Sequence, residues 1–191
     1  MLTARSEEFH LIFKEPVQTS RGVIDRKSGY LLKLSYDHSP DVIGTGECSV
    51  LSGLSYDDKS EYDMVIDWLC RNVHLPYARL MEELIEWPSI RFGLESAMLD
   101  LKNGGSGLLF ETPFTRGERP ICINGLVWMG DYAFMLKQID DKMKGGYNVI
   151  KIKVGAIDFE KELELIRHIR EQHDASQLTI RLDATGAFSL A

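Results

Sequence analysis

The sequence has few cysteines, and their spacing suggests no chemistry. Cys48, Cys70 and Cys122 are widely separated and form neither a Cys-x-x-Cys pair nor a cluster with histidine. Such an arrangement supplies no zinc site and no redox pair. We therefore expect three reduced, partly buried thiols in a cytoplasmic protein.

Long apolar runs and an excess of positive charge are also absent. No stretch of about 18 apolar residues is available to span a membrane. The N-terminus carries Glu7 and Glu8 and lacks the apolar core of an export signal. The net charge is −7, whereas a nucleic-acid-binding protein needs clustered Lys and Arg to contact phosphates. The sequence thus predicts no membrane partner and no nucleic-acid partner.

The remaining composition is that of a soluble globular protein. Apolar residues make up 44% of the 191 residues and charged residues 27%, which is ample material for a core. The five histidines are scattered, and their order supports no Ser-His-Asp or Cys-His arrangement. Any catalytic or ligand-binding site must therefore be built from other types of residue.

The first part of the chain has the pattern of strands followed by helices. Strands are predicted over 10–13, 29–36 and 41–50, and helices over 57–72, 77–86 and 89–102. A glycine-rich stretch at 103–107 ends the last helix. This order predicts an α+β domain, which we assign to residues 1–112.

Strands and helices alternate in the second part, residues 113–191. Strands are predicted over 120–124, 148–154 and 178–184, with helices over 131–144 and 158–172, the second beginning at an Asp158 N-cap. Such alternation is typical of a parallel sheet with crossover helices. Three strands fit either an open sheet or the start of an eight-stranded barrel, and length alone does not decide between them.

Lys151 and Lys153 are the most informative residues of this second domain. Alternation along a strand places both on one face and Ile150 and Ile152 on the other. Parallel strands are normally apolar on both faces, and unpaired buried lysines would be costly. The two lysines therefore point either into a polar cavity or, on an edge strand, toward solvent.

The next predicted strand carries a carboxylate near its carboxyl end, as the lysine strand carries its lysines. The parity of 179–185 places Thr179, Arg181, Asp183 and Thr185 on one face. Ligands of parallel sheets bind at the carboxyl ends of the strands. Two cations beside a carboxylate suit a metal-assisted reaction in which a lysine removes a proton α to a carboxylate. A solvated face of ion pairs would give the same pattern.

These segments resemble the muconate-lactonizing subgroup of the enolase superfamily. Residues 151–153 resemble its Lys-x-Lys motif on the second barrel strand, and 181–188 its Asp-Ala-Asn-Gly motif on the third. The turn at 44–47 and the segment 92–100 resemble its N-terminal capping domain, and 123–125 its first barrel strand. The resemblance implies an α+β capping domain followed by the start of a (β/α)8 TIM-type barrel, with about three strands present.

The resemblance also implies a role for each matching residue. Lys153 would be the base that removes the α-proton and the acid that assists departure of hydroxide, and Lys151 would be its electrostatic partner. Asp183 would be the first of three carboxylate ligands to Mg²⁺, at a site that would also accept Mn²⁺. Arg21 and Thr185 would bind the substrate, a small carboxylate. The family usually has Asn where this chain has Thr185, which lacks the amide donor.

Within the subgroup, segments 16–30 and 123–129 most resemble the enzymes of one activity. It is the dehydration of a succinyl-hydroxy-cyclohexadiene carboxylate in menaquinone synthesis. Dipeptide epimerases, N-acylamino acid racemases and cycloisomerases share the same chemistry and remain alternatives.

The chain ends shortly after the predicted third strand. In the family the other two metal carboxylates come from later strands, so we expect this chain alone to be catalytically incomplete. We also expect a homo-oligomer or pairing through the exposed edge of the last strand. A non-catalytic fragment and an unrelated open α/β binding domain are the alternatives from other classes.

Overall fold

The computed structural model describes residues 1–19, 22–184 and 186–189, with only the backbone of residues 18 and 19. The chain forms two compact units, Met1–Arg119 and Pro120–Ala191. Within the described ranges, every helix is too short or too polar to cross a membrane.

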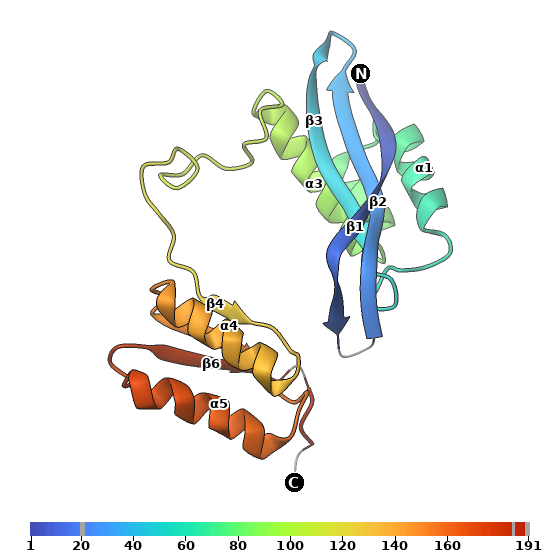
Figure 1. The fold of residues 1–191 in the computed structure, drawn as a ribbon. Coiled ribbons are helices and arrows are strands. Elements are labelled where there is room, and N and C mark those ends of the chain that lie inside the picture. Colours follow the sequence, from blue (N-terminus) through green and yellow to red (C-terminus); the bar gives the residue numbers. More distant parts are fainter. Residues whose placement is uncertain (20–21, 185, 190–191) are drawn as a thin grey trace. The chain divides into compact units, whose positions relative to one another are not determined.

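The N-terminal unit is built on an antiparallel sheet in the order β1-β2-β3 (Figure 1). Its strands are β1 (Leu2–Thr19), β2 (Gly22–Tyr36) and β3 (Ser39–Val50). The prediction of a short strand at 10–13 was too narrow, because β1 pairs with β2 from Leu2 onward. Main-chain pairing, rather than an apolar run, therefore extends β1 through its charged N-terminal half.

Three helices complete this unit. They are α1 (Tyr62–Asn72), α2 (Tyr77–Glu83) and α3 (Pro88–Lys102). Leu32 and Leu34 of β2 are fully buried in one cluster with apolar residues of all three helices. The helix predicted from residue 57 begins five residues later, because the buried Asp57 carboxylate accepts hydrogen bonds from the main-chain N–H (2.8 Å) and hydroxyl (2.6 Å) of Ser89.

Glycines allow α3 to approach β3 closely. The strand predicted over 41–50 is confirmed as part of β3, so residues 44–47 are extended rather than a turn. A methyl group on Gly46 would overlap the carbonyl oxygen of Gly93, and one on Gly44 would overlap that of Ala97. Main chain therefore packs directly on main chain here, which only glycine permits.

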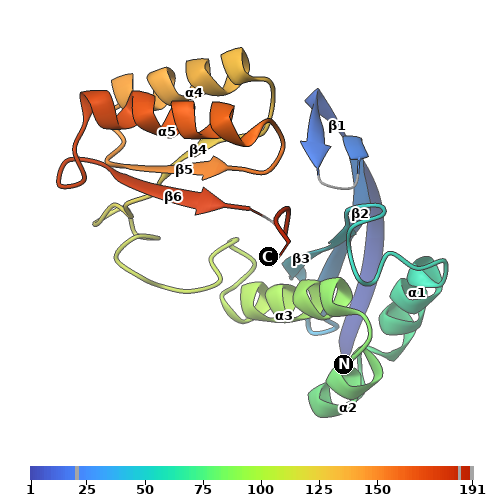
Figure 2. The ribbon, with the colours of Figure 1, turned by 90° about the horizontal axis from the view of Figure 1, so that it is seen from below.

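The C-terminal unit is a parallel sheet in the order β4-β5-β6. Its elements are β4 (Gly125–Val127), α4 (Tyr132–Lys144), β5 (Val149–Lys153), α5 (Phe159–Gln172) and β6 (Thr179–Asp183). Both helices lie side by side on the same face of the sheet (Figure 2). Ile150 and Ile152 of β5 are buried beneath them with Ile139 of α4 and Leu165 of α5.

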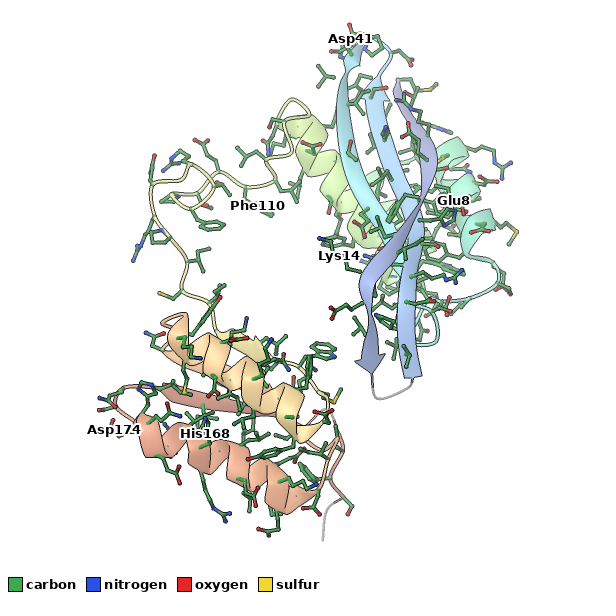
Figure 3. The ribbon with its side chains drawn as sticks, in the orientation of Figure 1. Glu8, Lys14, Asp41, Phe110, His168 and Asp174 are labelled. Atoms are coloured by element: carbon green, nitrogen blue, oxygen red, sulfur yellow. The ribbon has the colours of Figure 1, made fainter. Side chains whose placement is uncertain are left out.

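The sequence predicted the strands and helices of this unit correctly, with one exception. Asp158 caps α5 as predicted, accepting hydrogen bonds from the main chain of Glu160 and Lys161. The strand predicted over 120–124 was wrong, because Ile121 and Ile123 are 58% and 67% exposed and pairing begins at Gly125. His168 of α5 lies 2.8 Å from the Asp140 carboxylate of α4 and joins the two helices (Figure 3).

Candidate active site

The two lysines of β5 lie on the face of the sheet opposite the helices. Strand alternation puts them there, because Ile150 and Ile152 occupy the helix side. The edge-strand interpretation was wrong, since β5 lies between β4 and β6. Lys151 is 36% exposed and Lys153 only 16%, so the central strand holds both ammonium groups in a partly enclosed position.

Asp183 of β6 brings the lysines to a common point. The parallel register pairs Lys153 with Asp183, at the carboxyl ends of both strands. One carboxylate oxygen, Oδ2, lies 2.7 Å from Lys151 Nζ and 3.4 Å from Lys153 Nζ. The hydrogen bond from Lys151, followed by that from Lys153, lowers the pKa of Asp183 despite opposing desolvation. The predicted grouping of two cations and one anion is therefore present.

Arg181 extends the polar face toward the first strand. It pairs in register with Lys151, and its Nη1 donates to Asn124 Oδ1 at 3.4 Å, just before β4 begins. The predicted parity of β6 thus holds for Arg181 and Asp183. β5, β6 and the residue before β4 therefore contribute polar groups to this face.

The loops that follow β5 and β6 are fixed to each other and to α5. The nearly buried Glu162 carboxylate accepts hydrogen bonds from Gly155 N (2.6 Å) and Ala156 N (3.2 Å). Gly155 has φ +93°, and a methyl group on it would overlap the side chain of Ala187. The Val154 N–H donates to the Asp183 carbonyl oxygen at 3.0 Å. These contacts fix the main chain beside the candidate catalytic groups.

Two site residues escaped sequence analysis. Trp128 lies directly after β4, and Lys153 Nζ is 5.1 Å from the centroid of its ring. Glu162 is an acidic residue at helical spacing with the buried Leu165 and Ile169, a pattern that signals a buried carboxylate. Trp128 carried no such local signal, because the strand before it was predicted over 120–124 rather than at Gly125–Val127.

Arg21 and Thr185 lie outside the described residues. Asp183 suits a hard cation, because it is an oxygen ligand whose lowered pKa favours the ionised form. In the ranges that the structure describes, no group of three or more His, Cys, Asp or Glu residues could hold a metal ion. Asp183 therefore fits as one ligand of an incomplete set.

Comparison with known proteins shows what this chain is similar to. No family model matches the sequence. An o-succinylbenzoate synthase from Desulfotalea psychrophila is 40% identical over 212 residues, covering 95% of this chain and 57% of that protein. The crystal structure of MenC from the same organism has a TM-score of 0.79 at 33% identity, covering 98% of this chain and 58% of the other. An o-succinylbenzoate synthase structure from Thermosynechococcus elongatus has a TM-score of 0.72 at 24% identity and shares the fold, covering 98% of this chain and 53% of the other.

The fold is that of an enolase-type N-terminal capping domain followed by part of a barrel, as the sequence predicted. This chain belongs to the enolase superfamily. Within it, the chain is similar to the N-terminal part of o-succinylbenzoate synthase. The chain spans little more than half the length of the relatives it matches.

Proposed function

We propose that the protein to which this chain belongs is an o-succinylbenzoate synthase, which removes a proton α to a carboxylate and eliminates water. The observation that carries the proposal is the convergence of Lys151, Lys153 and Asp183 at the carboxyl ends of β5 and β6. The 40% identity to a synthase over 95% of the chain favours this activity over the other members of the subgroup. The substrate would be the succinyl-hydroxy-cyclohexadiene carboxylate of menaquinone synthesis, converted in the cytoplasm.

Lys153 is the proposed base and acid of the reaction. As a neutral amine it takes the α-proton, and the electrons of the C–H bond form a carbon–carbon double bond as the C–O bond breaks. The departing hydroxide receives the same proton from the Lys153 ammonium group and leaves as water. Lys153 is suited to this role because it is the less exposed of the two lysines.

Lys151 and Asp183 would control charge around the reacting carbon. The Lys151 ammonium group would attract the substrate carboxylate and the negative charge that develops when the proton leaves. Asp183 would hold Mg²⁺, or Mn²⁺, with ligands from outside the described residues. A bound divalent cation would stabilise the same negative charge as a Lewis acid. The T. elongatus synthase, which shares this fold, was crystallised with Mg in its active site.

We also infer that the 191-residue chain alone has no turnover. It spans 57% of its synthase relative, and in the described ranges the carboxylates do not gather into a metal site. Measurable o-succinylbenzoate formation by the purified chain would contradict this inference.

The test of the proposal uses the whole protein with Mg²⁺ and the cyclohexadiene substrate. Lys153→Ala should abolish o-succinylbenzoate formation, because a general base contributes on the order of 100-fold to 10,000-fold to rate. Lys161→Ala, an exposed lysine in the first turn of α5, is the matched control and should retain activity. Exchange of the substrate α-proton in D₂O gives a second readout of Lys153.

Two outcomes would contradict the proposal. Full turnover by the Lys153→Ala variant would exclude Lys153 as the base. Turnover of dipeptides or N-acylamino acids, without any of the cyclohexadiene substrate, would assign the protein to another activity of the subgroup.

A further inference from the structure

The Lys153 ammonium group has two kinds of neighbour. Asp183 Oδ2 is 3.4 Å away, but the same oxygen is held more closely by Lys151 at 2.7 Å. The second neighbour is the Trp128 ring, with its centroid 5.1 Å from Lys153 Nζ, within the range of a cation–π contact. The carboxylate alone therefore does not account for the position of Lys153.

Trp128 is itself held in place by a helix. The side chain of Gln138, in α4, accepts a hydrogen bond from the Trp128 main-chain N–H at 3.0 Å and donates to its carbonyl oxygen at 3.0 Å. These two bonds satisfy both main-chain groups of a residue that lies one position beyond β4, where strand pairing has stopped. The main chain that carries the indole is thereby attached to α4.

We propose that Trp128 is a positioning residue, which holds the Lys153 amine beside Asp183, and that Gln138 fixes Trp128 for this purpose. The ring covers one side of the amine and limits the rotamers of a long, flexible side chain. Lys151 is more exposed, so the two lysines are kept in different surroundings on the same strand face. This inference rests on the proposed function for the role of Lys153 as base, but the contact can be tested without turnover.

The experiment measures how fast each lysine is acetylated in the folded whole protein, by mass spectrometry of peptides after short exposure to an N-hydroxysuccinimide acetate ester. Trp128→Leu should raise the labelling rate of Lys153 about threefold relative to Lys151, as expected for loss of a cation–π contact. Trp128→Phe keeps an aromatic face and should retain the protection. Gln138→Met keeps the indole ring but releases the main chain of Trp128, and should give a smaller increase.

Lys142 and Tyr147 provide the matched control in the same unit. Lys142 Nζ is 5.5 Å from the centroid of the Tyr147 ring, so Tyr147→Leu should raise labelling of Lys142 and leave Lys153 unchanged. Trp128→Leu should have the reverse effect. Circular dichroism confirms that each variant is folded, and Gln138→Met supplies the test if Trp128→Leu does not fold.

Activity of the whole protein separates positioning from simple structural support. Trp128→Leu should lower kcat more than it raises KM, and Trp128→Phe should restore most of kcat. Unchanged Lys153 labelling in folded Trp128→Leu, or in Gln138→Met when Trp128→Leu does not fold, would overturn this inference whatever the activity. If Lys153→Ala retained turnover while the labelling changed as expected, the proposed function would fail and the contact would stand.

Discussion

Carboxylates of the N-terminal unit and the carboxylate at the strand ends of the C-terminal unit are bound in different ways. In the N-terminal unit the buried carboxylates of Asp57 and Asp100 accept hydrogen bonds from the main chain. At the ends of β5 and β6, Asp183 instead accepts from two lysine side chains. A carboxylate bound to main chain is fixed by the fold, whereas one bound to flexible cations can exchange them for another cation. The comparison separates groups that hold structure from groups available for chemistry.

The largest expected effect comes from the main-chain contact between β3 and α3. Gly46→Ala should lower the free energy of unfolding by about 3 kcal/mol, because the methyl group meets a backbone carbonyl that cannot rotate away. Urea denaturation measures the change. Gly104→Ala is the control: its methyl group meets no atom within 4 Å, and its φ of +79° costs about 1 kcal/mol. Equal effects of the two variants would refute the close-packing argument.

Asp100→Asn should be the next most damaging change. The two carboxylate oxygens accept from different groups, Oδ2 from Thr45 N at 2.9 Å and Oδ1 from Gly107 N at 2.7 Å. An amide keeps one acceptor and turns an NH₂ group toward the other donor, so we expect a loss of about 2 kcal/mol. Urea denaturation again gives the value. A loss under about 0.5 kcal/mol would mean that one of these bonds contributes nothing.

Glu162→Gln tests a carboxylate bound to main chain in the C-terminal unit and should lower the free energy of unfolding much less. Both main-chain donors, Gly155 N and Ala156 N, bind the same oxygen of Glu162, so the amide oxygen of Gln can replace it. We expect a loss of about 0.5 kcal/mol for Gln and about 2 kcal/mol for Leu, which leaves both donors unpaired. Equal losses in urea denaturation for Gln and Leu would show that charge, rather than hydrogen bonding, holds this loop.

The sequence predicted the kinds of elements better than their extents. Apolar periodicity located α3, and the Asp158 cap located the start of α5, because both signals are local. The full length of β1 could not be predicted, since it depends on pairing with β2. β4 has only three residues and begins with a glycine, so it is too short to show an apolar pattern. The isoleucines of 120–124 predicted the strand there, although both are exposed.

The candidate site was predictable where it depended on strand parity. Alternation placed Lys151, Lys153 and Asp183 on one face, and the end of the parallel strands indicated where a ligand would bind. The register that brings Lys153 opposite Asp183 depends on how two strands pair, which one sequence does not encode locally. The contact of Trp128 with Lys153 could not be predicted for the same reason, because it depends on hydrogen bonds between Trp128 and Gln138 of α4.

The pH dependence of stability is a further test of how Asp183 is bound, with a smaller expected effect. Because its folded-state pKa is below the ordinary 3.8, Asp183 stabilises the fold above that ordinary value. This contribution is lost as the pH falls through the lower folded pKa. The stability difference between the natural chain and Asp183→Asn should therefore shrink below about pH 4 and in high salt, which screens the lysine pairs. Urea denaturation across this pH range measures it, and a difference that grew with acid would contradict the assigned sign.

Each lysine should make a different contribution to the Asp183 carboxylate. Lys151 is nearer, 2.7 Å against 3.4 Å, and its hydrogen bond is the main cause of the lowered pKa of Asp183. Lys151→Met should therefore raise the pKa of Asp183 further toward its ordinary value than Lys153→Met does, as measured by carboxyl-carbon NMR titration. The opposite order would mean that Lys153 is the closer partner in solution. Lys151 would then be the less tightly paired of the two lysines.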